Sequence, residues 1–129
     1  MKMNTSPLEH VEQVHLFQWA VWQSGKYPEL DLMYAIPNGG YRNKKTAAEL
    51  KAEGVKSGVS DIFLPVARCG KHGLYIEMKR TEGGKLSKNQ EKFIADVKNQ
   101  GYAAIVCFGF EEAKAIILQY LNNKSGGTL

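Results

Sequence analysis

Cysteine is scarce in this sequence. Cys69 and Cys107 are the only two among 129 residues, and they lie far apart, without the spacing of paired metal ligands. Neither a disulfide framework nor a zinc site built from thiolates is therefore expected. Scarce cysteine fits a protein that works in a reducing environment.

Long apolar runs are also absent. No segment approaches the ~18 consecutive apolar residues that a membrane-spanning helix needs. The first residues, up to Pro7, lack the apolar core of a signal peptide. We therefore expect no membrane association and an intracellular location.

The length and the charge set the broad class. A chain of 129 residues can bury most of its unfolded surface as one domain. We expect a single domain over residues 1–129, with its core at about 7–121 and a flexible tail at 122–129. Lys and Arg number 17 against 13 Asp and Glu, and the net charge of +4 suits a polyanionic partner without proving one.

Residue patterns predict alternating helices and strands. The predicted helices cover residues 7–23, 46–53, 87–100 and 111–121. The predicted strands cover residues 32–36, 59–66, 74–79 and 102–108. Capping boxes are expected for Ser6 with Glu9 and for Ser87 with Gln90. The loop 68–73 favours an antiparallel hairpin, and a helix before the last strand allows a crossover, so an α/β fold with a central mixed β-sheet flanked by helices is expected.

Two acids and a lysine lie in the hairpin strands. Glu77 and Lys79 share one strand face, because side chains alternate, and antiparallel pairing could bring Asp61 beside Glu77. Two converging carboxylates repel each other unless a cation lies between them, and hard oxygen ligands suit Mg²⁺ or Mn²⁺. Such a cation could support phosphodiester hydrolysis, with Lys79 orienting water or offsetting developing charge. The alternative is that Asp61 only starts a turn and that Glu77 pairs with Lys79 on a solvated face.

Six motifs together carry a resemblance to a known family. They are Glu12-Gln13, Pro37-Asn38-Gly39-Gly40, Lys51-Ala52-Glu53-Gly54, Gly58-Val59-Ser60-Asp61, Glu77-Met78-Lys79 and Leu86-Ser87-Lys88-Asn89-Gln90. From about Glu9 to Leu121 the chain resembles a stand-alone VRR-NUC domain of the PD-(D/E)XK nuclease superfamily. This resemblance implies a restriction-endonuclease-like αβββαβ core and nuclease activity. Ser60 departs from the family pattern, which commonly has proline before the metal-binding aspartate.

The resemblance also implies roles in the metal site. Asp61 and Glu77 would hold Mg²⁺ or Mn²⁺, and the main-chain carbonyl of Met78 would complete the coordination. Lys79 would assist the nucleophile.

Two further roles fall on the helices. The family places an acid on its first helix, which we assign to Glu12, because Glu9 has the capping role and Glu12 can face the sheet edge. Glu9 is the competing candidate. A glutamine after the Glu-x-Lys strand corresponds to Gln90, which could contact the scissile strand, act only in the capping box with Ser87, or do both.

Basic and polar residues near the motifs are candidates for DNA contact. They are Asn38, Tyr41, Arg42, Lys44, Lys45, Lys56, Arg80 and Lys85. Phosphate contacts of this kind position DNA without reading its sequence. Tyr41 could stack on a base or simply pack within the protein.

Similarity to single-domain viral and bacterial members implies a homodimeric deoxyribonuclease in the cytoplasm of a bacterium or of a phage-infected host. Its expected substrate is branched DNA such as four-way (Holliday) junctions, whose two-fold symmetry needs paired incisions. A DNA-binding module without catalysis is the first alternative, and the joint presence of Asp61, Glu77 and Lys79 counts against it. A structural or assembly protein is the second, and it explains neither the motifs nor the basic loops.

Overall fold

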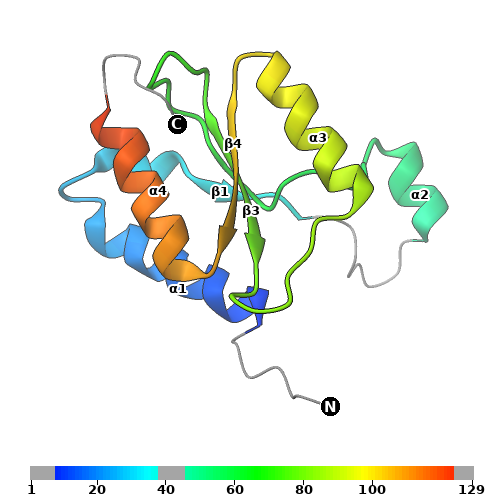
Figure 1. Cartoon of the computed structure of the whole chain (residues 1–129), viewed down its shortest axis with the longest axis horizontal. Coiled ribbons are helices and arrows are strands. Elements are labelled where there is room, and N and C mark those ends of the chain that lie inside the picture. The colour runs from blue at the N-terminus through cyan, green and yellow to red at the C-terminus, as the bar shows by residue number, and fades with distance from the viewer. Residues whose placement is uncertain (1–7, 38–45, 124–129) are drawn as a thin grey trace.

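The computed structural model describes residues 8–37 and 46–123 of the chain. A mixed sheet of four strands lies at the centre of these residues, with helices on both faces (Figure 1). The helices are α1 (Glu9–Gln23), α2 (Ala47–Ala52), α3 (Lys88–Asn99) and α4 (Phe110–Asn122), with a 3-10 helix, η1, over Pro28–Leu32. The strands are β1 (Tyr34–Ala35), β2 (Ile62–Leu64), β3 (Leu74–Lys79) and β4 (Ala103–Phe108). The predicted α/β fold with a mixed sheet flanked by helices is confirmed.

The strands are ordered β1-β2-β3-β4 across the sheet. The pairs β1–β2 and β2–β3 are antiparallel, whereas β3 and β4 are parallel. The β2–β3 pair is the expected hairpin, and α3 is the crossover that a parallel connection requires. Ile62 lies opposite Ile76 in the hairpin, so the residue before β2 comes level with Glu77.

The core lies between the sheet and the helix pair α1 and α4. Its buried residues include Leu16, Ala20, Ile62, Ile76, Met78 and Ile117. Because side chains alternate along β3, Glu77 and Lys79 point to the opposite face, where both contact α3 through Gln90. Figure 1 shows α1 and α4 on one side of β3 and β4, and α3 on the other.

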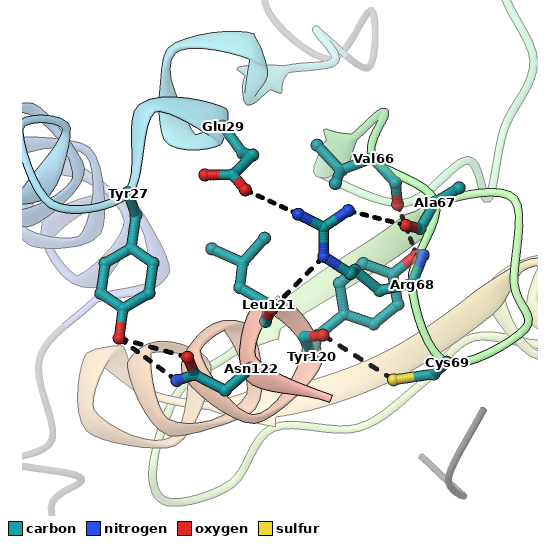
Figure 2. Close-up of polar contacts among 9 residues, drawn as sticks. All are labelled: Tyr27, Glu29, Val66, Ala67, Arg68, Cys69, Tyr120, Leu121 and Asn122. Carbon is teal, nitrogen blue, oxygen red and sulfur yellow. Dashed lines mark hydrogen bonds and ion pairs between the residues drawn. The ribbon is translucent and has the colours of Figure 1, made fainter. Parts of the chain in front are cut away.

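Polar contacts join three elements where the β2–β3 hairpin turns (Figure 2). Arg68 donates from Nη2 to Glu29 Oε2 at 2.6 Å and from Nε to the carbonyl of Leu121 at 3.3 Å. The Tyr120 hydroxyl donates to the carbonyl of Val66 at 2.6 Å. These contacts tie η1, the hairpin loop and α4 together, so they support the fold at the end of the sheet remote from Glu77.

The start of α1 differs from the prediction. The helix begins at Glu9, with Leu8 in the N-cap position and no side-chain capping hydrogen bond. The expected capping box requires Glu9 at the third helical position, but Glu9 occupies the first, so this prediction is wrong. Ser6 itself and most of the expected tail at 122–129 lie outside the described residues.

Two strands are shorter than expected. The strand expected over 32–36 covers only β1, because Pro28 opens η1 with a backbone angle suited to a helix start. The strand expected over 59–66 covers only β2. Gly58, with φ of +92°, lies so close to α3 that a Cβ would clash, and Pro65 lacks the N–H of a strand ladder. The other elements agree with the prediction to within about two residues.

Candidate active site

Asp61 and Glu77 come together at the open end of the β2–β3 hairpin. Asp61 immediately precedes β2, and the register places it level with Glu77. Asp61 Oδ2 accepts a hydrogen bond from the backbone N–H of Met78 at 2.7 Å, which holds the carboxylate against β3. The structure thus brings together the two acids that the sequence pattern singled out.

Glu77 is a buried carboxyl group with one oxygen that lacks a partner. Glu77 is 2% exposed. Oε2 accepts a hydrogen bond from Gln90 Nε2 at 3.1 Å, whereas Oε1 has no hydrogen-bond partner among the described residues when the group is ionised. Burial, and then a hydrogen bond to Asp61 and its negative charge, raise the pKa of Glu77 to about 9, against the opposing effect of Lys79. This carboxyl group therefore binds a positive partner, either a proton or a cation, at neutral pH.

Gln90 connects Lys79 to Glu77. Lys79 is 7% exposed, and its Nζ donates to Gln90 Oε1 at 3.0 Å. The same Oε1 accepts from the backbone N–H of Ser87 at 2.9 Å, and the N–H of Gln90 donates to Ser87 Oγ at 3.1 Å. The predicted capping box at the start of α3 is therefore confirmed, and the same glutamine also contacts the site. The Gln90 side-chain oxygen faces two donors and its NH₂ group faces an acceptor, so one orientation of the amide satisfies all of these contacts.

The donor set fits a hard divalent cation. An orphaned, buried Glu77 Oε1 beside a second carboxylate is the kind of ligand pair that Mg²⁺ and Mn²⁺ prefer. Among residues 8–37 and 46–123, no group of three or more His, Cys, Asp or Glu is placed to hold a metal ion. A cation here would thus use two carboxylates and fill its other positions with water or main-chain oxygen, as Mg²⁺ commonly does. The carbonyl of Met78 stays a prediction for one of these positions.

The side chain of Glu12, a residue of α1, contacts the start of α4. It is 7% exposed, and its Oε1 accepts from the backbone N–H of Phe110 at 3.1 Å. Gly109, the N-cap of α4, supplies no side chain, and a Cβ there would come within 2.9 Å of Glu12 Oε2. Glu12 thus supplies from α1 a side-chain acceptor for the first N–H of α4, which the N-cap glycine cannot supply.

Glu9 is an acid of α1 whose negative charge acts on Glu77. Its negative charge contributes to the raised pKa of Glu77, and it lines a groove together with Asp61. One of the two reasons for assigning the first-helix role to Glu12 is the predicted capping role of Glu9, and the start of α1 at Glu9 removes that reason. The choice between Glu12 and Glu9 stays a prediction. The sequence places Glu9 one helical turn before Glu12. Only the observed start of α1 shows that Glu9 does not act in a capping box.

The residues considered for DNA contact are only partly described. Asn38, Tyr41, Arg42, Lys44 and Lys45 lie outside the described residues. Lys56 and Lys85 are exposed and Arg80 is half-buried. Lys56 and Lys92 both line a small cleft of about 230 Å³ against α3, so Lys92 joins the basic residues on this side although the sequence patterns did not single it out.

Comparisons with known proteins agree with this geometry. A family model described as the VRR-NUC domain matches residues 9–111. A solved structure titled "VRR_NUC domain protein" is 28% identical, covers 97% of this chain and 98% of its own, and has a TM-score of 0.81. No curated protein sequence matches the chain. Within the described residues, no helix is both long and apolar enough to span a lipid bilayer.

Proposed function

Because the chain belongs to the VRR-NUC domain family, which is nuclease-related, we propose that it is a metal-dependent endonuclease that hydrolyses DNA phosphodiester bonds. The observation that carries this proposal is the buried Glu77. Its ionised Oε1 has no hydrogen-bond partner among the described residues, although Asp61 lies beside Glu77. Gln90 donates to the other oxygen of Glu77 and accepts from Lys79. When the carboxyl group is ionised, this buried oxygen needs a bound proton or cation to satisfy it, and a cation is the partner that a nuclease site would use.

Asp61 and Glu77 are the residues that would hold Mg²⁺ or Mn²⁺. When bound there, the cation supplies the Lewis acidity that polarises a phosphoryl oxygen. Lys79 lies two residues from Glu77 on the same face of β3, and its ammonium is held by Gln90. Lys79 thereby offsets negative charge that develops on the phosphate as the water oxygen bonds to phosphorus and the P–O bond to the leaving oxygen breaks. Gln90 positions both Lys79 and Glu77 and is not required to touch the DNA.

We extend the proposal to a homodimer that acts on branched DNA such as four-way junctions. The net charge of +4 favours a polyanionic partner. The similar solved chain is covered over 98% of its length by this chain. One such domain carries one site, and a junction with two-fold symmetry needs two.

Purified protein can be tested on labelled linear duplex, flap and four-way-junction DNA with Mg²⁺, with Mn²⁺ and with chelator. We expect cleavage only with a divalent cation, and a loss of at least about a hundredfold in Glu77→Ala and Lys79→Ala. Two variants of exposed residues on α3 serve as matched controls and should stay active: Glu91→Ala is the control for Glu77→Ala, and Lys98→Ala is the control for Lys79→Ala.

Activity in the presence of chelator, or in Glu77→Ala, would contradict the mechanism. DNA binding without any cleavage by the unmodified protein would identify a binding module instead. The preference for branched DNA is measured separately, by comparing junction with linear duplex at one salt concentration, because salt alone changes affinity strongly.

A further inference from the structure

A groove lies along one flank of α1, and Asp61 is part of its lining. Its volume is about 620 Å³, within the range of small-molecule sites. Val14, Phe17 and Val21 line it. They recur at three- and four-residue spacing, so they form one stripe beside the buried stripe of α1. The stripe is open to solvent, with Val14 at 41% and Val21 at 71% exposure.

The chemistry of the lining favours a flat, neutral and partly polar occupant. Two amide side chains, Gln13 and Gln18, lie among the apolar residues and can both donate and accept hydrogen bonds. No lysine or arginine of the described residues lines the groove, whereas the two acids Glu9 and Asp61 do, together with His10. The two carboxylates disfavour a phosphate group along this flank. A nucleobase matches it, because a base has apolar faces, a hydrogen-bonding edge and no charge.

The position of the groove indicates which base would enter. Asp61 belongs both to the groove lining and to the pair of carboxylates proposed to hold the cation. A strand whose scissile phosphate lies at Asp61 and Glu77 thus has its neighbouring nucleotide next to the groove mouth. A base inside a duplex is stacked and paired and cannot turn into such a groove without the loss of those contacts, whereas a base at a branch point or in a flap can.

We propose that the α1 groove binds a nucleobase of an unpaired nucleotide that adjoins the scissile phosphate. The inference rests on the proposed nuclease function and names a feature of its substrate that continuous duplex DNA lacks. The apolar stripe receives the faces of the base, and Gln13 and Gln18 receive its edge. The groove then selects for unpaired structure without reading a long sequence.

The proposal is tested by binding rather than by cleavage. Oligonucleotides carry the fluorescent base 2-aminopurine at single positions across a flap or junction branch point, with a fully paired duplex as reference. They are mixed with Lys79→Ala protein in Mg²⁺, so that binding is followed without turnover. We expect a fluorescence change confined to one unpaired position, because only that base leaves its neighbours for the groove. Equal changes at all positions, or none at any, overturn the proposal.

Two variants make a matched comparison. Val14→Glu places a charge in the groove, and Val11→Glu places the same charge on the same helix outside it; the two valines are 41% and 38% exposed. We expect Val14→Glu to weaken binding of the branched probe roughly tenfold more than Val11→Glu does, with equal effects on duplex. Val21→Glu, at a still more exposed position, should act like Val14→Glu and guards against a folding defect at one site.

A different occupant gives a different result. If a second copy of the chain fills the groove, Val14→Glu lowers the molecular mass in solution and affects branched and duplex DNA alike, which overturns the proposal. Failure of this inference is distinguishable from failure of the proposed function. Position-specific fluorescence in a protein that never cleaves retains the base site and rejects the nuclease, and metal-dependent cleavage without that signal does the reverse.

Discussion

Burial and a neighbouring acid both raise the pKa of Glu77. Together with the hydrogen bond to Asp61, they raise the pKa of Glu77 from its ordinary value of 4.5 to about 9. In the metal-free protein this carboxyl group is thus protonated at neutral pH. A cation that binds the ionised pair must displace the proton, so the affinity for metal should increase with pH until about 9.

The stability of the metal-free protein should carry the same signature. Because the pKa of Glu77 is raised on folding, its stabilising contribution is complete below the unfolded value of 4.5 and is lost as pH rises through about 9. In chelator, we expect the free energy of unfolding of the unmodified protein to fall relative to that of Glu77→Gln between about pH 6 and about pH 9, by up to about 1.4 kcal/mol per pH unit. The Tm should fall over the same range. Calorimetry of both proteins across this range checks it. Parallel profiles would show that the proton on Glu77 is not coupled to folding.

Among the elements, α1 places one acid against the start of α4 and another near the proposed cation site. Glu12 accepts the N–H of Phe110 at the start of α4, and the charge of Glu9 acts on Glu77. The two residues are one helical turn apart, so truncation of each should affect a different property.

We expect Glu12→Ala to lower the free energy of unfolding by about 1–3 kcal/mol, because it leaves a helix-start N–H without its acceptor. Glu9→Ala should change stability by less than about 0.5 kcal/mol and should weaken Mn²⁺ binding instead. Chemical denaturation and calorimetric Mn²⁺ titration of both variants measure the two effects. Loss of Mn²⁺ binding in Glu12→Ala with unchanged stability would instead support Glu12 as the first-helix acid of the site.

The sequence was sufficient for those elements whose signals are local. The β3 strand was predicted over its full length from one apolar run, and the capping box of Ser87 and Gln90 marked the start of α3. Antiparallel pairing of strands that follow each other in sequence was also predictable, and it allowed Asp61 to be placed beside Glu77 in advance. Contacts between distant segments gave no such signal. Glu12 and Phe110 are 98 residues apart, and only the packing of α1 on α4 brings them together.

The ends of elements were harder to predict than the elements themselves. Propensity alone extended β2 back to residue 59, but Gly58 packs against α3 and turns the chain before the strand begins. Likewise, Pro7 suggested an earlier start to α1 than Glu9. In both cases the element begins later than predicted, whereas Asp61 and Glu77 come together as predicted.

At the scale of the whole molecule, one chain offers one pair of site carboxylates among its described residues. A homodimer would therefore hold two sites, and each would cut one strand. Mixed dimers that contain one active and one inactive chain separate this arrangement from a monomer that acts twice. The inactive chain can carry Glu77→Ala, which removes the carboxylate proposed to hold the cation.

Mixed dimers are obtained by co-expression of the unmodified chain and a differently tagged Glu77→Ala chain, followed by purification on both tags. On a supercoiled plasmid that extrudes a four-way junction, the unmodified dimer should give linear product, because both incisions occur in one encounter. The mixed dimer should give mainly nicked circles, with initial rates of first-strand cutting about half those of the unmodified dimer. A double Glu77→Ala dimer that binds the junction without cutting is the control. Linear product formed by the mixed dimer at the same ratio to nicked circles as by the unmodified dimer would instead show that a single chain makes both cuts.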